Sequence, residues 1–371
     1  MKNIVIVHYS PLELYPPLQN LIGFLKEYKK CKVAVFTTKL SDKVSITFNS
    51  PSSSISINRV LRSDTNRSKA IRYFCYFVFH IRCLINIIKL RPIRLFYFET
   101  LSSLAPFIYK AFFNRSVGLL IHYHEYISNI EYQKASPVLF YLHKLEKRIY
   151  NRSIWISHTN KFRLDMFRED ISPIRLENLY VIPNYPPRTW KAFPKPILGM
   201  PIKVVYAGAL SLTTMFTETF ARWVVDQKGK VIWDIYSYNF TQDVDLFIKQ
   251  LESPWVKLNP GVDYDELPSI LIRYDVGIIL YKGHIPNYIY NAPNKLFEYL
   301  ACGLSVWLPS VMVGSLSYCT DETYPQVVAL DFNGLDVFTP ESALNASNFP
   351  LKSTDYFCDT ALSPLLNVLL K

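Results

Sequence analysis

The sequence predicts an α/β protein with two doubly wound, Rossmann-like domains. Three observations predict this fold: apolar strand-like runs alternate with amphipathic segments, the length of 371 residues suits about two domains, and a proline-rich stretch lies midway. The domains are expected at 1–185 and 202–352. Residues 186–201 are the expected linker, and 353–371 contain a last apolar helix.

The first domain opens as a βαβ unit, which indicates a parallel sheet. Apolar runs at 3–8 and 32–37 are the expected strands, with a helix around 17–29 between them. The serine-rich residues 41–58 are expected to form a hairpin or a loop.

Three polar residues, His8, Tyr9 and Ser10, follow the first apolar run. They lie at the expected carboxyl end of a strand, where open α/β sheets bind their ligands. The turn lacks the G-x-G-x-x-G pattern, which argues against a dinucleotide dehydrogenase. These three residues are therefore candidates for binding a substrate.

The most unusual composition lies in residues 59–94, which hold nine Lys or Arg and one acid, Asp64. At helical spacing, one face of 72–90 is apolar; it comprises Phe74, Phe77, Val78, Ile81, Leu84, Ile85 and Ile88. The opposite face comprises Arg72, Tyr76, His80, Arg82, Asn86 and Lys89. Arg82, near the middle, argues against a transmembrane helix. The favoured interpretation packs the apolar face on the sheet; the alternative rests it in an anionic membrane interface.

Strand-like and helical runs continue to alternate through residue 182. The expected strands are 95–99, 117–123 and 154–157, and the expected helices are 102–113 and 132–150. His124 and Glu125 follow the second of these strands and are candidates for a base or a sugar ligand, or for packing within the loop. Their spacing is weak for a metal, and no metal site is predicted.

The second domain begins with an expected strand at 203–206 and Gly208 at its end. Glycine permits close approach of a ligand to the backbone, although a simple tight turn explains it equally well. Thr213, with Thr214, is expected to cap the next helix. Tyr281 opens a tyrosine-rich loop suited to stacking against a base or sugar. The expected elements around these residues are strands 231–236, 256–258 and 276–280 and helix 264–273.

Residues 291–308 combine a loop, a helix and a strand. Asn291 is expected to cap the helix and Pro293 to occupy its first position. The helix N-terminus and Lys295 together make a phosphate site. Glu298, one turn later on the helix surface, is placed to accept two vicinal sugar hydroxyls. The spacing predicts a site for a nucleotide-diphosphate sugar, or an ordinary amphipathic helix.

This stretch resembles the donor site of GT-B-fold glycosyltransferases, family four, through Pro-x-Lys-x-x-Glu-Tyr-x-Ala-x-Gly-x-x-Val. The resemblance covers residues 263–308 and implies two domains facing a cleft, with a terminal helix that crosses back to the first. It implies that Glu298 binds ribose; the phosphate and sugar contacts it implies are Asn291, Pro293, Asn294 and Lys295. The chain departs from the family at Tyr290, where a second glutamate is usual, and after Gly208, where Arg and Lys are absent. Lys295 is then expected to oppose most of the diphosphate charge.

The expected activity is glycosyl transfer from a nucleotide-diphosphate sugar to a hydroxyl of a saccharide, lipid-linked, in surface polysaccharide synthesis. Lys295, with His124 or Glu125 as base if configuration inverts, would be the catalytic residues. No cofactor is expected. The alternatives are a sugar-nucleotide epimerase of the same fold, or a non-catalytic protein that binds an anionic polymer or membrane.

Charge and cysteine content set the expected location. Residues 1–190 carry 28 Lys or Arg against 12 acids, whereas residues 191–371 carry 13 against 18. This asymmetry suits an anionic partner of the first domain and not a coat on nucleic acid. Six cysteines without metal spacing fit reduced thiols, and the short apolar run at the start does not suit a signal peptide. A cytoplasmic protein, peripheral on the inner membrane face through 59–94, is expected.

Overall fold

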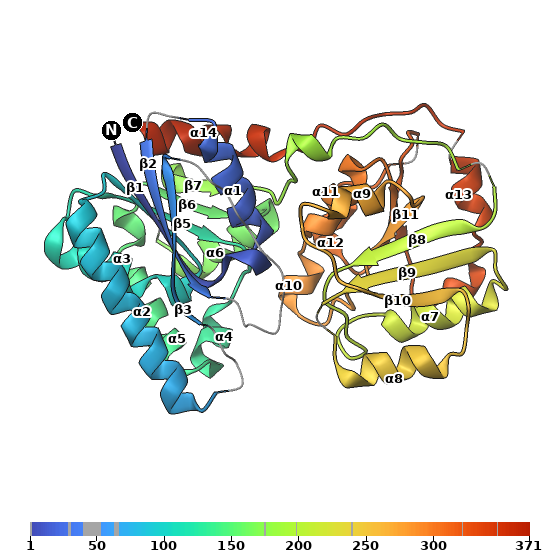
Figure 1. Cartoon of the computed structure of the whole chain (residues 1–371), viewed down its shortest axis with the longest axis horizontal. Coiled ribbons are helices and arrows are strands. Elements are labelled where there is room, and N and C mark those ends of the chain that lie inside the picture. Colours follow the sequence, from blue (N-terminus) through green and yellow to red (C-terminus); the bar gives the residue numbers. More distant parts are fainter. Residues whose placement is uncertain are drawn as a thin grey trace. The chain divides into compact units, whose positions relative to one another are not determined.

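In the computed structural model, residues 2–28, 31–39, 53–62, 67–173, 176–197, 199–238, 240–320, 322–346 and 348–371 are described. They form two compact units (Figure 1). The first comprises Met1–Pro183 together with Asp359–Lys371, and the second comprises Asn184–Cys358.

The first unit contains a seven-stranded parallel sheet in the order β3-β2-β1-β4-β5-β6-β7. Its strands are β1 (Lys2–Pro11), β2 (Cys31–Lys39), β3 (Ile55–Arg62), β4 (Arg94–Phe98), β5 (Gly118–Tyr123), β6 (Trp155–His158) and β7 (Leu179–Val181). The strand order reverses between β1 and β4, which makes their carboxyl ends the topological switch point of this sheet. Nearly continuous apolar runs form β1, β4 and β5 because both faces of the sheet are covered.

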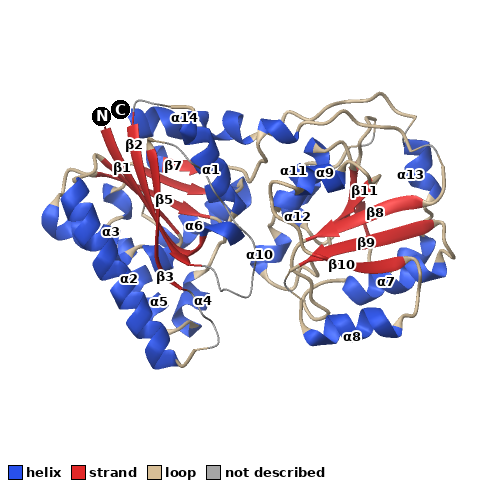
Figure 2. Ribbon diagram, viewed as in Figure 1, coloured by secondary structure: helices blue, strands red, loops and turns tan. Residues whose placement is uncertain are grey.

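Helices cover both faces of the first sheet (Figures 1 and 2), with α2 and α3 on one and α1 and α14 on the other. They are α1 (Pro16–Lys26), α2 (Lys69–Leu90), α3 (Leu104–Ile108), α4 (Asn129–Lys134), α5 (Pro137–Lys147), α6 (Lys161–Ile171) and α14 (Cys358–Leu370). Short 3-10 helices are η1 (Leu12–Leu14), η2 (Thr100–Ser102), η4 (Tyr150–Arg152) and η5 (Leu176–Asn178), and η3 (Tyr109–Phe113) is one turn of π-helix. Arg94 Nε donates to the carbonyl oxygen of Val368 at 2.8 Å, which ties α14 to the start of β4.

The second unit contains a six-stranded parallel sheet in the order β10-β9-β8-β11-β12-β13. Its strands are β8 (Ile202–Ala207), β9 (Val231–Ser237), β10 (Val256–Pro260), β11 (Val276–Ile278), β12 (Ser305–Pro309) and β13 (Val327–Leu330). Its helices and turns are η6 (Arg188–Trp190), α7 (Thr217–Asp226), α8 (Gln242–Gln250), α9 (Leu267–Leu271), α10 (Pro286–Ile289), α11 (Asn294–Ala301), α12 (Val313–Leu316), η7 (Leu335–Val337) and α13 (Glu341–Ala346). One apolar core contains α7 and α8, and another contains α9 and α11. The strand order reverses between β8 and β11. Both predicted Rossmann-like, doubly wound domains are confirmed.

Helix α2 buries a different face from the one expected. Its buried side chains are Tyr76, Phe79, His80, Cys83 and Ile87, whereas Phe74, Phe77, Ile81 and Ile85 are 69, 49, 57 and 47% exposed. The His80 ring on this buried face has two partners: it bonds the carbonyl oxygen of Leu101 at 2.9 Å and accepts from the N–H of Ala105 at 3.2 Å. The helix thus packs on the sheet as expected, but through the Phe79–Ile87 face, while the Phe74–Ile81 face is exposed.

The serine-rich residues 41–58 are described only in part. Residues 55–58 belong to β3, which pairs in parallel with β2, so they are not part of a hairpin or loop. The rest of 41–58 lies mostly outside the described residues.

Helix α2 has the length and composition of a membrane-crossing helix, and it is the one such helix in the described ranges. Its Phe79, Cys83 and Ile87 nevertheless belong to the apolar core of the first unit.

Candidate functional site

The first predicted ligand-binding residues lie at the switch point of the first sheet, inside the last part of β1. His8 is buried, its ring centroid lies 4.2 Å from that of Tyr15, and burial lowers its pKa to about 3. Tyr9 faces the other side of the sheet, where its ring contacts Phe79 of α2. Ser10 is exposed. Since side chains alternate along a strand, the structure does not bring these three residues onto one surface.

The loop after β5 holds the other two candidates in this unit. His124 is half-buried and Glu125 is exposed. The carbonyl oxygen of His124 accepts from the guanidinium of Arg163, a buried residue of α6. The ring centroid of His124 lies 5.3 Å from that of Tyr15, so the loop and the end of β1 meet around Tyr15.

Glu99, which sequence reasoning placed at the end of a strand without a role, is the centre of this group. It directly follows β4, and its backbone has φ of 64°, a strained value for a residue other than glycine. Its Oε1 accepts from the N–H of His124 at 2.7 Å and from the Tyr15 hydroxyl at 3.2 Å. Burial, aided by the negative charge of Glu125, raises the pKa of Glu99 to about 8. The available signal was its position at the carboxyl end of the strand beside β1.

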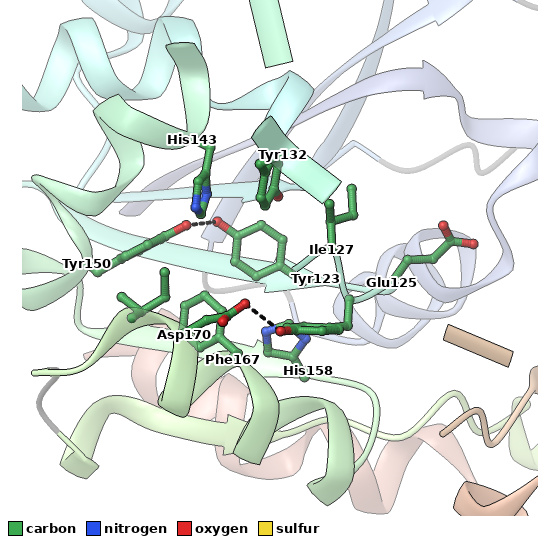
Figure 3. Close-up of a pocket in the computed structure, with 11 residues that line it drawn as sticks. Tyr123, Glu125, Ile127, Tyr132, His143, Tyr150, His158, Phe167 and Asp170 are labelled. Atoms are coloured by element: carbon green, nitrogen blue, oxygen red, sulfur yellow. Dashed lines mark hydrogen bonds between the residues drawn. The ribbon is translucent and has the colours of Figure 1, made fainter. Parts of the chain in front are cut away.

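Beside this loop lies a small cavity of about 10 Å³, lined mainly by aromatic side chains (Figure 3). Figure 3 shows Glu125 directed away from the labelled rings. The neighbouring carboxyl of Glu146 is fully buried and accepts from the hydroxyls of Tyr97 and Tyr123, each at 2.8 Å. The Tyr123 and Tyr150 hydroxyls are 3.0 Å apart. A space this small has room for about one water molecule, so we interpret the cluster as a buried polar network of the core.

In the second unit, Gly208 and Lys295 lie together at the switch point. Gly208 follows β8 with φ of 136°, a conformation that favours glycine. A methyl group built on Gly208 would lie 2.7 Å from both Cε and Nζ of Lys295, so a larger residue would displace the end of this side chain. The ammonium lies 5.4 Å from the centre of the Tyr206 ring. Among the described residues, no carboxylate lies within ion-pair distance of Lys295 Nζ.

Glu298 lies one turn further along α11 and completes this group. It is 5% exposed, which corrects the expected position on the helix surface. Burial raises its pKa to about 7, against the opposing effects of the Lys295 charge and a hydrogen bond from Tyr264. Hydroxyl donors from a ligand would compensate for this lost hydration.

The remaining predicted residues of the second unit surround this group. Helix α11 starts at Asn294 with Pro293 as its N-cap, so the expected cap at Asn291 is wrong; Asn291 instead accepts the Ser315 hydroxyl through its carbonyl oxygen at 2.7 Å. Tyr281, just after β11, pairs with Met215 through an isolated bridge.

Thr213 does not cap a helix as expected, because α7 begins four residues later with Phe216 as its N-cap. Its hydroxyl lies 3.0 Å from that of Ser211, within a turn whose Leu212 carbonyl oxygen accepts from Lys282 Nζ at 2.9 Å. The ammonium of Lys282 is thus engaged by this carbonyl oxygen. Lys295 is therefore the better candidate for binding a phosphate.

The described residues contain no cluster of three or more His, Cys, Asp or Glu side chains that could hold a metal ion. Each unit holds its own candidate group, at the switch point of its sheet. The first is centred on Glu99, and the second is formed by Gly208, Lys295 and Glu298.

No protein-family model matches the chain, and no curated protein sequence matches it. Solved structures do match over its whole length. Anabaena HepE in complex with UDP and glucose has a TM-score of 0.64 at 12% identity, covering 100% of this chain and 99% of that one. Sucrose-phosphate synthase from Thermosynechococcus elongatus has 0.68 at 15%, covering 100% and 96%. UDP-GlcNAc 2-epimerase from Neisseria meningitidis, bound to UDP-GlcNAc, has 0.57 at 11%, covering 100% of both. The chain therefore shares the two-domain Rossmann-like fold of these enzymes.

Proposed function

We propose that this protein is a glycosyltransferase that moves a sugar from a nucleotide-diphosphate donor to a hydroxyl of a saccharide acceptor. The observation that carries the proposal is the group at the second switch point, where Lys295 lies against Gly208 and Glu298 is buried one turn away. A cation for the diphosphate, a carboxyl for vicinal hydroxyls and a glycine that opens the strand end are the parts that such a donor needs. The likeness in fold to HepE with UDP and glucose supports this choice.

In this proposal Lys295 and the N–H groups at the start of α11 oppose the charge that develops on the leaving diphosphate. Glu298 accepts the ribose hydroxyls, and Tyr281 and the turn at Thr213 border the donor. No metal is required, because Lys295 supplies the positive charge.

The first unit is proposed to hold the acceptor, a saccharide linked to a lipid. Glu99, His124 and Glu125 meet near Tyr15 at the carboxyl edge of its sheet. With a pKa of about 8, Glu99 holds a proton near neutral pH, so it does not serve as the base. Because its carboxyl accepts from the N–H of His124, we assign it the role of positioning the His124 loop. Glu125, or His124, is the base if the reaction inverts configuration and an acceptor ligand if it retains it.

Replacing Glu298 with alanine is expected to weaken binding of UDP or GDP by about 1–3 kcal/mol, the cost of losing a hydrogen-bonded charged partner. Isothermal titration calorimetry of both nucleotides measures this loss. Glu266→Gln, a change at an exposed carboxyl of the same unit, is the control and is expected to bind as the wild type does. Unchanged affinity in a folded Glu298→Ala protein would contradict the ribose assignment.

The epimerase remains the second candidate, because UDP-GlcNAc 2-epimerase shares the fold, with a lower TM-score than the other two. Incubation with UDP- and GDP-sugars separates the candidates. An epimerase converts the donor without acceptor, whereas a transferase releases nucleoside diphosphate when the acceptor is added. A protein that binds anionic polymer or membrane without catalysis shows no affinity for either nucleotide.

We also propose that the protein works at the cytoplasmic face of an anionic membrane, in surface polysaccharide synthesis, with α2 as the contact. Its exposed row Phe74, Phe77, Ile81 and Ile85 recurs every three or four residues, which forms one apolar stripe. Arg72, Arg82 and Lys89 are exposed on the same helix. Apolar side chains flanked by cations suit the boundary between acyl chains and phosphates.

Replacing Phe74 and Ile81 together with serine is expected to lower binding to anionic vesicles by about tenfold or more, since each side chain loses apolar area that the membrane would bury. Vesicle co-sedimentation measures the change, and wild-type binding is expected to rise with anionic lipid and fall with salt. Leu246→Ser, at a half-exposed position of α8, is the control. Equal binding of the double variant and wild type would leave α2 as a surface helix only.

A further inference from the structure

A second cationic feature lies in the first unit, apart from the candidate site. A cavity of about 350 Å³ is formed where η3, the turn before β5 and the end of α5 meet. The residues that line it are Phe107, Lys110, Ala111, Arg115, Arg148, Ile149 and Arg152. Four of these seven are basic and none is acidic. The turns that carry them precede β5 and β6, so the cavity lies at the amino edge of the sheet, opposite the edge that holds Glu99.

The fold holds the Lys110 side chain and the backbone turn that carries Arg115. Lys110 is buried, and its ammonium donates to the carbonyl oxygen of Val117 at 2.6 Å. The side chain of Asn114 accepts from the N–H of Ser116 at 3.0 Å and of Val117 at 3.1 Å, which fixes the turn that carries Arg115. A polar group that is ordered before its ligand arrives loses less entropy on binding.

The charges of this cavity are not balanced within the described part of the chain. No acidic side chain there forms an ion pair with Arg115, Arg148 or Arg152. The pKa of Lys110 is lowered, first by burial and then by the positive charge of Arg152. The cations thus repel one another, and an anion between them would relieve this repulsion and form charge-assisted hydrogen bonds.

Exposed aromatic side chains border the same turn. Phe112 and Phe113 follow Ala111 directly and are 77 and 56% exposed. The turn η3 also contacts α2, the helix with the exposed apolar stripe. Phenyl rings beside a cluster of cations match the boundary between acyl chains and phosphates in a membrane surface.

We propose that this cavity binds the phosphate of an anionic lipid headgroup, with Arg115, Arg148 and Arg152 as its ligands and Phe112 entering the acyl boundary. A lipid headgroup and a free phosphate would both present a phosphate group to these arginines. The exposed rings favour the lipid as its source. The inference does not depend on the transferase activity, because binding is measured without donor or acceptor.

The test compares two double variants of equal charge change in vesicle co-sedimentation. Arg148→Gln with Arg152→Gln is expected to weaken binding to phosphatidylcholine vesicles containing phosphatidylglycerol by about thirtyfold, given the contribution of each basic residue near a membrane. Lys161→Gln with Arg168→Gln changes two exposed cations of α6 and is expected to cause a loss below about threefold. Equal losses in the two double variants, or no loss in the first, would overturn the proposal.

Two further arms identify the source of the phosphate. Phe112→Ser is expected to lower the binding that remains at high salt several-fold, while Phe193→Ser, at an equally exposed position of the second unit, leaves it unchanged. Calorimetry with pyrophosphate tests the free anion. Competition between pyrophosphate and vesicles supports the cavity as the lipid site. A lipid ligand would be rejected if the Arg148→Gln, Arg152→Gln double variant lost binding of pyrophosphate but bound vesicles as the wild type does.

Discussion

Alanine in place of Lys295 is expected to lower kcat by about 10²–10³, the scale for removing one group that stabilises a developing charge. The diphosphate gains negative charge as the glycosidic bond breaks, so the ammonium matters more in the transition state than in the bound donor. The fall in kcat should therefore exceed the rise in donor KM. Steady-state kinetics with varied donor measures both.

Two variants sharpen this test. Lys295→Arg is expected to recover only part of the rate, because a planar guanidinium does not replace a compact ammonium against Gly208. Lys257→Ala, at an exposed position of β10, serves as the matched control and is expected to keep wild-type kinetics. Wild-type turnover of Lys295→Ala without added divalent metal would show that the diphosphate is bound elsewhere.

Alanine in place of Glu146 is expected to lower the free energy of unfolding by about 3–5 kcal/mol, because a buried tyrosine hydroxyl would lose its acceptor and the truncated side chain would leave a cavity. Tyr97 loses its 2.8 Å partner, while Tyr123 and Tyr150 can still bond each other. Chemical denaturation measures the loss. Glu169→Ala, at an exposed position of α6, is expected to change it by less than about 0.5 kcal/mol.

The same residue gives the stability a pH dependence. Burial raises the pKa of Glu146 to about 7, above the value of about 4.3 in an unfolded chain. The folded state therefore holds a proton that the unfolded state releases, so this contribution is complete below pH 4 and is lost as the pH rises through 7. Glu146→Gln is expected to remove about 1.4 kcal/mol per pH unit from the slope between pH 5 and 7. An unchanged slope would contradict a neutral carboxyl.

The alternation of strands and helices could be predicted from the sequence because strands buried on both faces leave continuous apolar runs, as in β1 and β5. The contact between Gly208 and Lys295 could be anticipated only in outline. Gly208 follows a predictable strand and Lys295 lies in the first turn of a predictable helix, but 87 positions separate them, and only the strand order β8-β11-β12 brings them together.

Two features could not be predicted from periodicity. Helix α2 is apolar on most of its circumference, so the pattern could not decide which side faces the sheet; His80 faces it because Leu101 and Ala105 supply partners from distant sequence. The residue type of Glu99 did not indicate a role in the candidate site. Its partners His124 and Tyr15 come from other parts of the chain. Burial among them and the charge of Glu125 raise its pKa, against the lowering effect of the hydrogen bonds from His124 and Tyr15.

The return of α14 to the first unit makes that unit discontinuous along the chain. Arg94 and Val368, which are hydrogen-bonded, are separated by 274 residues. During synthesis, the sheet of the first unit emerges long before the helix that completes it, and the whole second unit is translated in between. The second unit can fold from contiguous residues, whereas the first must wait or fold without its last helix, with the entropic cost of closing a long loop. An isolated first unit would therefore require residue 183 to be joined to residue 359 by a designed link.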